Sequence, residues 1–233
     1  MTDTRVGTDG LVRPVWAADD GDMQTYYDTE WGVPVTDEQC VFERLCLEGF
    51  QAGLSWRTIL TKREAFRELF EGFEVEKVAA FTEDDVERLA ADARIIRHRG
   101  KIRAAIGNAQ ATVALRSVGC VTAPGGAAID LAARTLAAGQ QVEAGLPALI
   151  WSFMPERTPT PAVLSDIPTQ DENSLLLSKT LKKLGFKFIG PTSAYAMMEA
   201  IGVLDTHLVT SHRRGISGLW NEDGMRRNAV SLP

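Results

Sequence analysis

The segment that decides the fold reads LKKLGFKFIGP over residues 181–191. An apolar helical pattern leads into it, glycines stand at 185 and 190, and Pro191 is typical of the first turn of a second helix. Two helices joined by so short a turn expose backbone N–H groups at a helix N-terminus, which favours the binding of an anion. The alternative is a plain helical hairpin whose apolar residues, Phe186, Phe188 and Ile189, pack in a core.

The rest of the sequence indicates a mainly α-helical chain. Strand signals are scarce, whereas Ala, Leu, Arg and Glu recur at helical spacing. Thr36 with Gln39, and Thr82 with Asp85, have the spacing of capping boxes that begin helices. A further helix is expected from about residue 101 to 116.

Composition and glycine content suggest the domain organisation. We expect a flexible N-terminal segment (1–12), a helical domain of two lobes (13–212) and a C-terminal tail (213–233) that Trp220 could anchor. The Gly- and Ala-rich stretch 117–145 is the candidate connection between the lobes.

The overall composition excludes several classes of protein. The 233 residues are 45% hydrophobic and 24% charged, which is typical of a globular protein. No apolar run reaches the roughly 18 to 20 residues of a membrane span, and the N-terminus lacks a secretion signal. The three cysteines form no CxxC pair, which argues against a disulfide scaffold. We therefore expect a cytoplasmic, monomeric protein with no membrane partner.

The charge is unevenly distributed along the chain. The net charge is −6, from 25 basic and 31 acidic residues, but the windows 93–129 and 173–198 contain no acid and hold ten of the 25 Lys and Arg. Local clusters of this kind can neutralise phosphates even in an acidic protein. The alternative is that both windows are solvated helix faces.

Glu48 is the candidate functional acid. It follows Val41 and Leu45 at spacings that place it on or beside the apolar stripe of its helix. A buried carboxylate needs a partner, so this position predicts either a structural salt bridge or a functional role. Neighbouring aromatic residues favour a pocket for a flat cationic ring, although aromatic residues are more often part of a core.

Four segments resemble the bacterial DNA-3-methyladenine glycosylase I family. They read YYDTEWGVP (26–34), LEGFQAGLSW (47–56), IIRHRGKI (95–102) and LKKLGFKFIG (181–190), within a match that runs from about Trp16 to His207. The resemblance implies an all-α, two-lobed helix-hairpin-helix DNA glycosylase fold. It also implies a DNA repair enzyme that flips 3-methyladenine out of damaged double-stranded DNA and hydrolyses its N-glycosidic bond, without lyase activity and without a cofactor.

The resemblance also implies the site residues. Glu48 and Tyr26 match the acid and the tyrosine that contact the base, and Gly53-Leu54 matches the segment that enters the gap in the duplex. The aromatic and polar neighbours are expected to bind the base: Trp16, Trp31, Gln51 and Trp56. The basic windows and the hairpin are expected to bind DNA through Arg97, Arg99, Lys101, Lys187, Gly190, Thr192 and Ser193.

Two features depart from the family's pattern. Relatives commonly hold zinc with two Cys and two His, but the matching positions here are Pro14, Tyr27, His207 and Ser211, so we expect no metal. Asp205 resembles the catalytic aspartate of the wider superfamily, and it either acts in catalysis or caps the last helix.

Two other functions remain open at this point. The chain could be a non-catalytic helix-hairpin-helix DNA-binding protein, although Glu48, Tyr26 and Trp56 argue against this. It could also be a glycosylase for another damaged base, because Met23 stands where relatives tend to have an aromatic residue.

Overall fold

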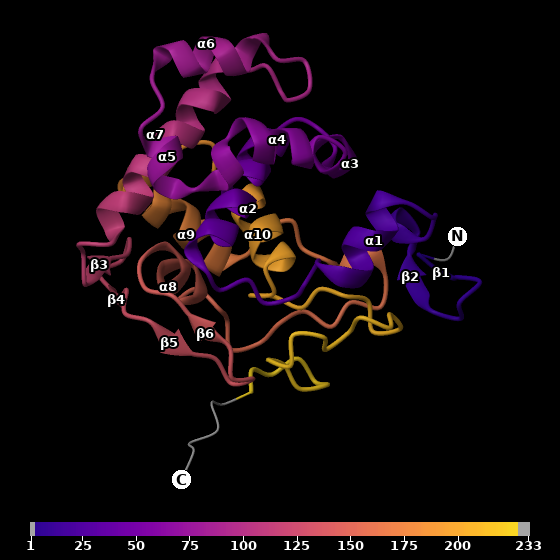
Figure 1. Cartoon of the computed structure of the whole chain (residues 1–233). Coiled ribbons are helices and arrows are strands. Elements are labelled where there is room, and N and C mark those ends of the chain that lie inside the picture. Colours follow the sequence, from indigo (N-terminus) through magenta and orange to yellow (C-terminus); the bar gives the residue numbers. More distant parts are fainter. Residues whose placement is uncertain (1–2, 228–233) are drawn as a thin grey trace.

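A computed structural model describes residues 3–227, and it is mainly helical (Figure 1). The helices are α1 (Asp22–Thr29), α2 (Glu38–Gln51), α3 (Trp56–Leu60), α4 (Arg63–Leu69), α5 (Val75–Ala79), α6 (Glu83–Ala91), α7 (Arg99–Leu115), α8 (Leu146–Trp151), α9 (Glu172–Lys183) and α10 (Pro191–Ala200). Short 3₁₀ helices cover Val15–Ala17, Glu71–Phe73 and Leu164–Asp166. This confirms the prediction of an α-helical fold.

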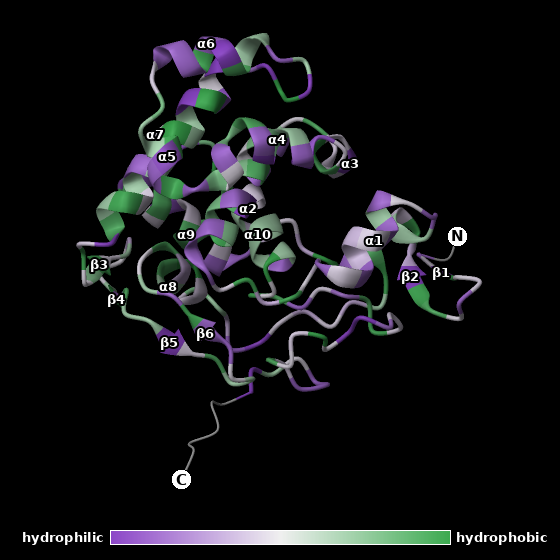
Figure 2. Cartoon of the chain, in the orientation of Figure 1, coloured by the Kyte–Doolittle hydropathy of each residue, from purple (hydrophilic) through white to green (hydrophobic). Residues whose placement is uncertain are grey.

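Helix α2 lies at the centre of the molecule. It contacts α7, α8 and α10, and α10 packs in turn against α9. Figure 1 shows α3 to α7 gathered above α2, with α8 and the C-terminal segments below it. The fully buried residues Phe42, Leu45 and Phe50 place α2 in the core, because they repeat at helical spacing on its inner face. Helix α6, which is largely hydrophilic, lies at the outer edge (Figure 2).

The N-terminal segment is more ordered than its composition suggests. Strand β1 (Thr4–Val6) pairs antiparallel with β2 (Val12–Pro14), so most of the segment 1–12, which was expected to be flexible, lies in a β-hairpin from residue 4 onward. Hydrogen bonds between the strands are supplemented at the turn by Gly7, whose amide donates to the Leu11 carbonyl at 2.9 Å. Residues 1–2 lie outside the described range.

The connection 117–145 forms two small β-hairpins. Strand β3 (Cys120–Thr122) pairs with β4 (Ala128–Asp130), and β5 (Arg134–Thr135) pairs with β6 (Gln141–Val142). The glycines of this stretch mark its tight turns, since Gly125, Gly126 and Gly139 have positive φ.

The predicted helix starts are accurate to within a few residues. Asp85 accepts a hydrogen bond from the Thr82 amide at 2.9 Å, which confirms that capping box. The start of α2 differs, because Asp37 rather than Thr36 is the N-cap and accepts from the Cys40 amide. In the described part of the tail, residues 213–227, Trp220 is buried and only 2% exposed.

The segment after α1 lies against the end of α10. Gly32 and Gly202 both have φ near +80°, and a Cβ atom at Gly202 would lie 2.8 Å from the Gly32 carbonyl oxygen. Glycine is therefore needed where these two segments cross. Among the described residues, no helix is both long and apolar enough to cross a membrane.

Candidate active site

A pocket of about 360 Å³ opens between α1, α2 and α10. It brings together all six residues predicted to contact the base: Trp16, Tyr26, Trp31, Glu48, Gln51 and Trp56. Its wall also contains Met23, Ile167, Ala196, Glu199 and Ala200. Of these, the sequence pattern pointed only to Met23. Residues from distant parts of the chain thus converge on a cavity of the size that suits a small flat ligand.

Glu48 is the deepest acidic residue on α2. Its side chain is 4% exposed, and its carboxylate accepts no hydrogen bond from any residue in the range 3–227. Burial and the nearby Glu199 carboxylate raise the pKa of Glu48 to about 8, while Arg44 opposes the rise. The Glu48 carboxylate is available to a ligand, because it forms no salt bridge within the described chain.

Aromatic rings form the rest of the cavity. The Tyr26 and Trp56 ring centroids lie 5.2 Å apart, and the Trp16 and Trp31 rings meet edge to face at 5.6 Å. The Arg44 guanidinium lies 5.7 Å from the Tyr26 ring. These apolar faces would stack on a planar base and attract a cationic one.

A buried charge network positions the two helices that carry Tyr26 and Glu48. Glu30, just after α1, accepts from Arg44 of α2 at 2.5 Å and from Arg63 of α4 at 2.7 Å. Arg63 also donates to Glu43 of α2 at 2.7 Å. Because these groups are largely desolvated and mutually paired, the network fixes α1 against α2.

A narrower groove continues from the pocket to the surface. Glu48 and Gln51 line both cavities, and the groove is completed by Gly53 and Leu54 on one segment and by Thr192 and Ser193 of α10 on another. The Leu54 side chain is 42% exposed. The predicted DNA-contact residues of these two segments therefore lie at the entrance of the pocket.

The α9–α10 hairpin is attached to α7. The Asn108 side chain accepts from the Lys187 amide at 2.8 Å and donates to the Lys187 carbonyl at 3.1 Å. Gly190 is the N-cap of α10 and Pro191 its first residue, as predicted. The exposed side chain of Lys187 and the N-terminus of α10 are thus held in a defined position.

Lys101 has a different position from the one expected. It is 8% exposed, and its Nζ donates to the carbonyl oxygens of Phe50 at 2.9 Å and Ala52 at 2.6 Å. Burial lowers its pKa. Lys101 therefore positions the segment that carries Gly53 and Leu54, and the structure does not support a direct contact with DNA.

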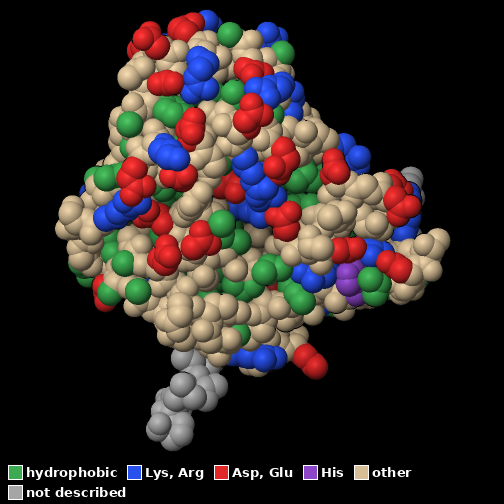
Figure 3. Space-filling view, viewed as in Figure 1, with side chains coloured by type: hydrophobic (Ala, Val, Ile, Leu, Met, Phe, Trp, Pro, Cys, Tyr) green, Lys and Arg blue, Asp and Glu red, His purple; other side chains and the backbone are tan. Residues whose placement is uncertain are grey.

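The first acid-free window is not a free basic surface. Its arginines pair with acids from other segments: Arg94 with Glu68 and Asp92, Arg99 with Glu87, Arg103 with Glu83, and Arg116 with Glu38 and Glu76. Blue and red side chains are correspondingly interspersed over the upper part of Figure 3. Within the described chain, Arg97 and Lys187 form no such pair. Of the predicted DNA-binding cations, these two remain available.

Asp205 does not line the pocket. Its Oδ1 accepts from the amide and Nδ1 of His207, at 3.1 and 2.8 Å, and its Oδ2 accepts from the Gly215 amide at 2.8 Å. It is 3% exposed, and α10 ends five residues earlier. Neither predicted role fits, because both oxygens are used to hold the 205–215 segment together.

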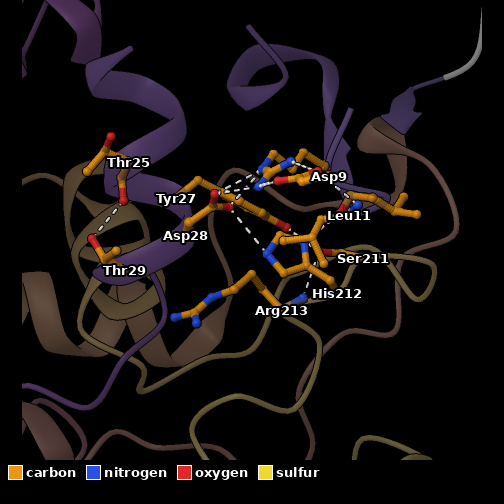
Figure 4. A network of polar contacts seen from close by, with 11 residues as sticks. Asp9, Leu11, Thr25, Tyr27, Asp28, Thr29, Ser211, His212 and Arg213 are labelled. Atoms are coloured by element: carbon orange, nitrogen blue, oxygen red, sulfur yellow. Dashed lines mark hydrogen bonds and ion pairs between the residues drawn. The ribbon is translucent and has the colours of Figure 1, made fainter. Parts of the chain in front are cut away.

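The positions that match the family's zinc ligands hold a different set of contacts. The Tyr27 and Ser211 hydroxyls lie 2.5 Å apart, and the His207 ring packs 4.6 Å from that of Trp31. Next to them His212 meets Asp28 at 3.3 Å (Figure 4). The Arg13 side chain donates to the carboxylates of Asp9 and Asp28. Zinc needs about four N, S or O ligands, and proline offers none, so these residues do not fit the ion.

The chain is similar to known proteins over most of its length. The methyladenine glycosylase family model matches residues 16–121 and 126–214. The DNA-3-methyladenine glycosylase 1 of Escherichia coli K12 is 45% identical over 199 residues, covering 83% of this chain and 92% of that protein. The DNA-3-methyladenine glycosylase of Haemophilus influenzae is 38% identical, with the same coverage.

Solved structures show the same fold. A crystal structure of 3-methyladenine DNA glycosylase I has a TM-score of 0.73 and 39% identity, over 86% of this chain and 98% of the other. The Staphylococcus aureus enzyme, solved to explain 3-methyladenine recognition, has a TM-score of 0.70 and 33% identity over 84% and 93%. The chain belongs to the methyladenine glycosylase family.

Proposed function

We propose that the protein is a DNA repair glycosylase that hydrolyses the N-glycosidic bond of 3-methyladenine in alkylated double-stranded DNA. The observation that carries the proposal is a buried Glu48, unpaired within residues 3–227, in an aromatic pocket whose entrance is lined by Leu54 and the start of α10. Family membership supports the same activity. We further propose that the protein acts as a monomer in the cytoplasm.

The pocket suits a lesion that carries its own positive charge. Methylation at N3 makes adenine a cation and therefore a good leaving group. Glu48 would accept hydrogen bonds from the flipped base, and the Trp56 and Tyr26 rings would stack near it. The glycosidic bond breaks with both electrons passing to the base, which leaves as neutral 3-methyladenine. Water then adds to the sugar carbon and loses a proton, leaving an abasic site.

The hairpin and the entrance groove would hold the DNA backbone. Lys187, the Gly190 N-cap and Thr192 present a cation and a helix N-terminus to a phosphate. Leu54, which is 42% exposed, would fill the space that the flipped nucleotide leaves. Pro191, Thr192 and Ser193 follow the hairpin with no lysine among them, which supports hydrolysis without strand cleavage.

Base release from methylated DNA tests the function. Chromatography of the released bases after incubation with wild-type protein is expected to give 3-methyladenine. Release of 7-methylguanine or another base in its place would indicate a shifted specificity. DNA binding with no release at all would identify a non-catalytic binding protein.

A further inference from the structure

A second carboxylate lines the base pocket. Glu199, near the C-terminal end of α10, is on the pocket wall with Glu48 of α2. The Thr206 hydroxyl donates to its Oε1 at 2.6 Å. Its Oε2 accepts no hydrogen bond from residues 3–227, and the side chain is partly accessible. One oxygen of Glu199 is therefore held in place while the other is available to a ligand.

The two acids are close enough to influence each other. Burial raises the pKa of Glu199 to about 8, opposed by the Thr206 hydrogen bond, and the charge of Glu199 contributes to the raised pKa of Glu48. When two carboxylates share a poorly solvated site, ionising both is costly. A pocket without ligand at neutral pH therefore retains at least one proton on this pair.

Few other charges compensate for the pair. Among residues 3–227, Arg44 of α2 is the cation that lowers the pKa of Glu48, and it is already paired with Glu30. Within the described chain, the charge of Glu48 acts on the phenol of Tyr26 (α1) and that of Glu199 on the phenol of Tyr195 (α10), and the pKa values of both phenols are raised mainly by burial. Neither phenol supplies a positive charge, so a cationic ligand would be the missing counter-charge.

We propose that Glu199 is a specificity-determining residue that, together with Glu48, makes the pocket select a positively charged purine and release a proton to solvent when it binds. The inference rests on the proposed function for its substrate class. A cation favours the doubly ionised pair, whereas a neutral purine leaves the pair protonated. After the bond breaks, the base is neutral, the pair takes a proton back from solvent, and the attraction that held the cation is lost.

The test uses binding alone, so that it is separate from catalysis. The probe is 3,9-dimethyladeninium, a permanent cation without a sugar, and neutral 9-methyladenine is the comparison ligand. Quenching of tryptophan fluorescence reports binding, since three tryptophans line the pocket. Wild-type protein is expected to bind the cation at least about tenfold more tightly at pH 9 than at pH 6, because the pair ionises in this range. Binding of 9-methyladenine should not change in this way.

Glu199→Gln is the decisive variant. Glutamine keeps an oxygen that can accept from Thr206, but it removes the second charge and the repulsion that adds to the effect of burial on the pKa of Glu48. The ratio of affinities at the two pH values should fall to about threefold or less. Glu64→Gln is the matched control, because Glu64 is 84% exposed on α4 and pairs only with Arg67 within the described chain. It should bind as the wild type does.

A second variant controls for the possibility that Glu199→Gln changes cation binding because it misfolds. Thr206→Val leaves Glu199 in place but removes the donor that favours its ionised form. The pH midpoint of cation binding should therefore rise in this variant, and it should fall in Glu199→Gln. If Glu199→Gln keeps the wild-type ratio, or if the wild type binds both ligands equally at pH 9, the inference is wrong. Failure of base release with normal cation binding would instead contradict the proposed function.

Discussion

The Tyr27 hydroxyl lies 2.5 Å from the Ser211 hydroxyl, 184 positions away in the sequence. This hydrogen bond joins α1 to the C-terminal segment at two positions where relatives commonly carry zinc ligands. The adjoining Arg13 is 3% exposed and bonds to both Asp9 and Asp28. The N-terminal hairpin is thereby joined to α1 beside Tyr27. Hydrogen bonds and ion pairs therefore connect the two ends of the chain here.

We expect metal analysis of the purified protein to find no bound zinc. Addition of EDTA should leave the melting temperature unchanged, because the contacts between Tyr27, Ser211 and Arg13 involve no ion. One tightly held zinc per chain, with a loss of stability on chelation, would contradict this.

The Tyr27–Ser211 contact itself can be tested by deleting one hydroxyl. Tyr27→Phe should lower the free energy of unfolding by about 1 to 2 kcal/mol, since Ser211 then loses a buried partner. Urea denaturation measures the change. Tyr195→Phe is a suitable control, because the Tyr195 hydroxyl is buried without a hydrogen-bond partner among the described residues.

Glu48→Gln should lower the excision activity while it raises the stability of the protein at alkaline pH. Excision of 3-methyladenine is expected to fall by about 100-fold, because the pocket loses the acid that the base would contact. The carboxyl pKa is raised from 4.5 to about 8 on folding, so its favourable contribution is complete below about pH 4.5 and is lost as the pH rises through 8. Between pH 4.5 and pH 9 the variant should thus gain stability relative to the wild type by on the order of 5 kcal/mol, given about 1.4 kcal/mol for each pKa unit between 4.5 and 8.

Urea denaturation of both proteins at pH 5 and pH 9 checks the second half of this prediction. Equal differences in stability at the two pH values would mean that Glu48 does not change its protonation in this range. Full excision activity in the variant would remove Glu48 from the mechanism.

Lys101→Met should slow excision without changing the base pocket. The variant loses the two hydrogen bonds that hold the carbonyl oxygens of Phe50 and Ala52, so the Leu54 segment is less well positioned. We expect kcat/KM to fall by about tenfold, with a loss of stability of about 1 to 3 kcal/mol. The affinity for 3,9-dimethyladeninium should be unchanged. Lys179→Met, at an exposed position of α9, is the control.

Two basic residues should differ in their effect on DNA affinity. Lys187→Ala should weaken binding to undamaged DNA and reduce the slope of log K against log salt by about one, because its side chain is exposed and unpaired in the described chain. Arg99→Ala should leave the slope nearly unchanged, since Arg99 is paired with Glu87 at 2.7 Å. Fluorescence anisotropy over a range of salt concentrations measures both slopes. A larger effect of Arg99→Ala than of Lys187→Ala would indicate that the window 93–129 binds DNA.

The sequence predicted those features that depend on local pattern. The hairpin around Gly190, the apolar stripe that carries Glu48 and the aromatic residues near it could all be found from spacing. Glu199 could have been found in the same way, because it follows Thr192 and Ala196 at helical spacing and so shares their face. It was missed because a single acid at the end of a helix has no local signal of function.

The prediction of a free basic surface over residues 93–129 differs from the structure for a tertiary reason. Residues 93–129 contain no acid, but α6 packs against α7 and brings Glu83 and Glu87 to the arginines of that window. Lys101 likewise finds its partners about fifty residues away in the chain. Spacing along the sequence gives no information about such contacts.

Helix α7 contacts both segments that are proposed to touch DNA. Lys101 holds the segment before Leu54, and Asn108, seven residues later, holds the backbone of Lys187. Seven residues of α-helix span about 10 Å, so a single rigid element sets the spacing between these two anchors. A DNA duplex that meets both proposed contact segments would therefore have to match the spacing that α7 sets between them.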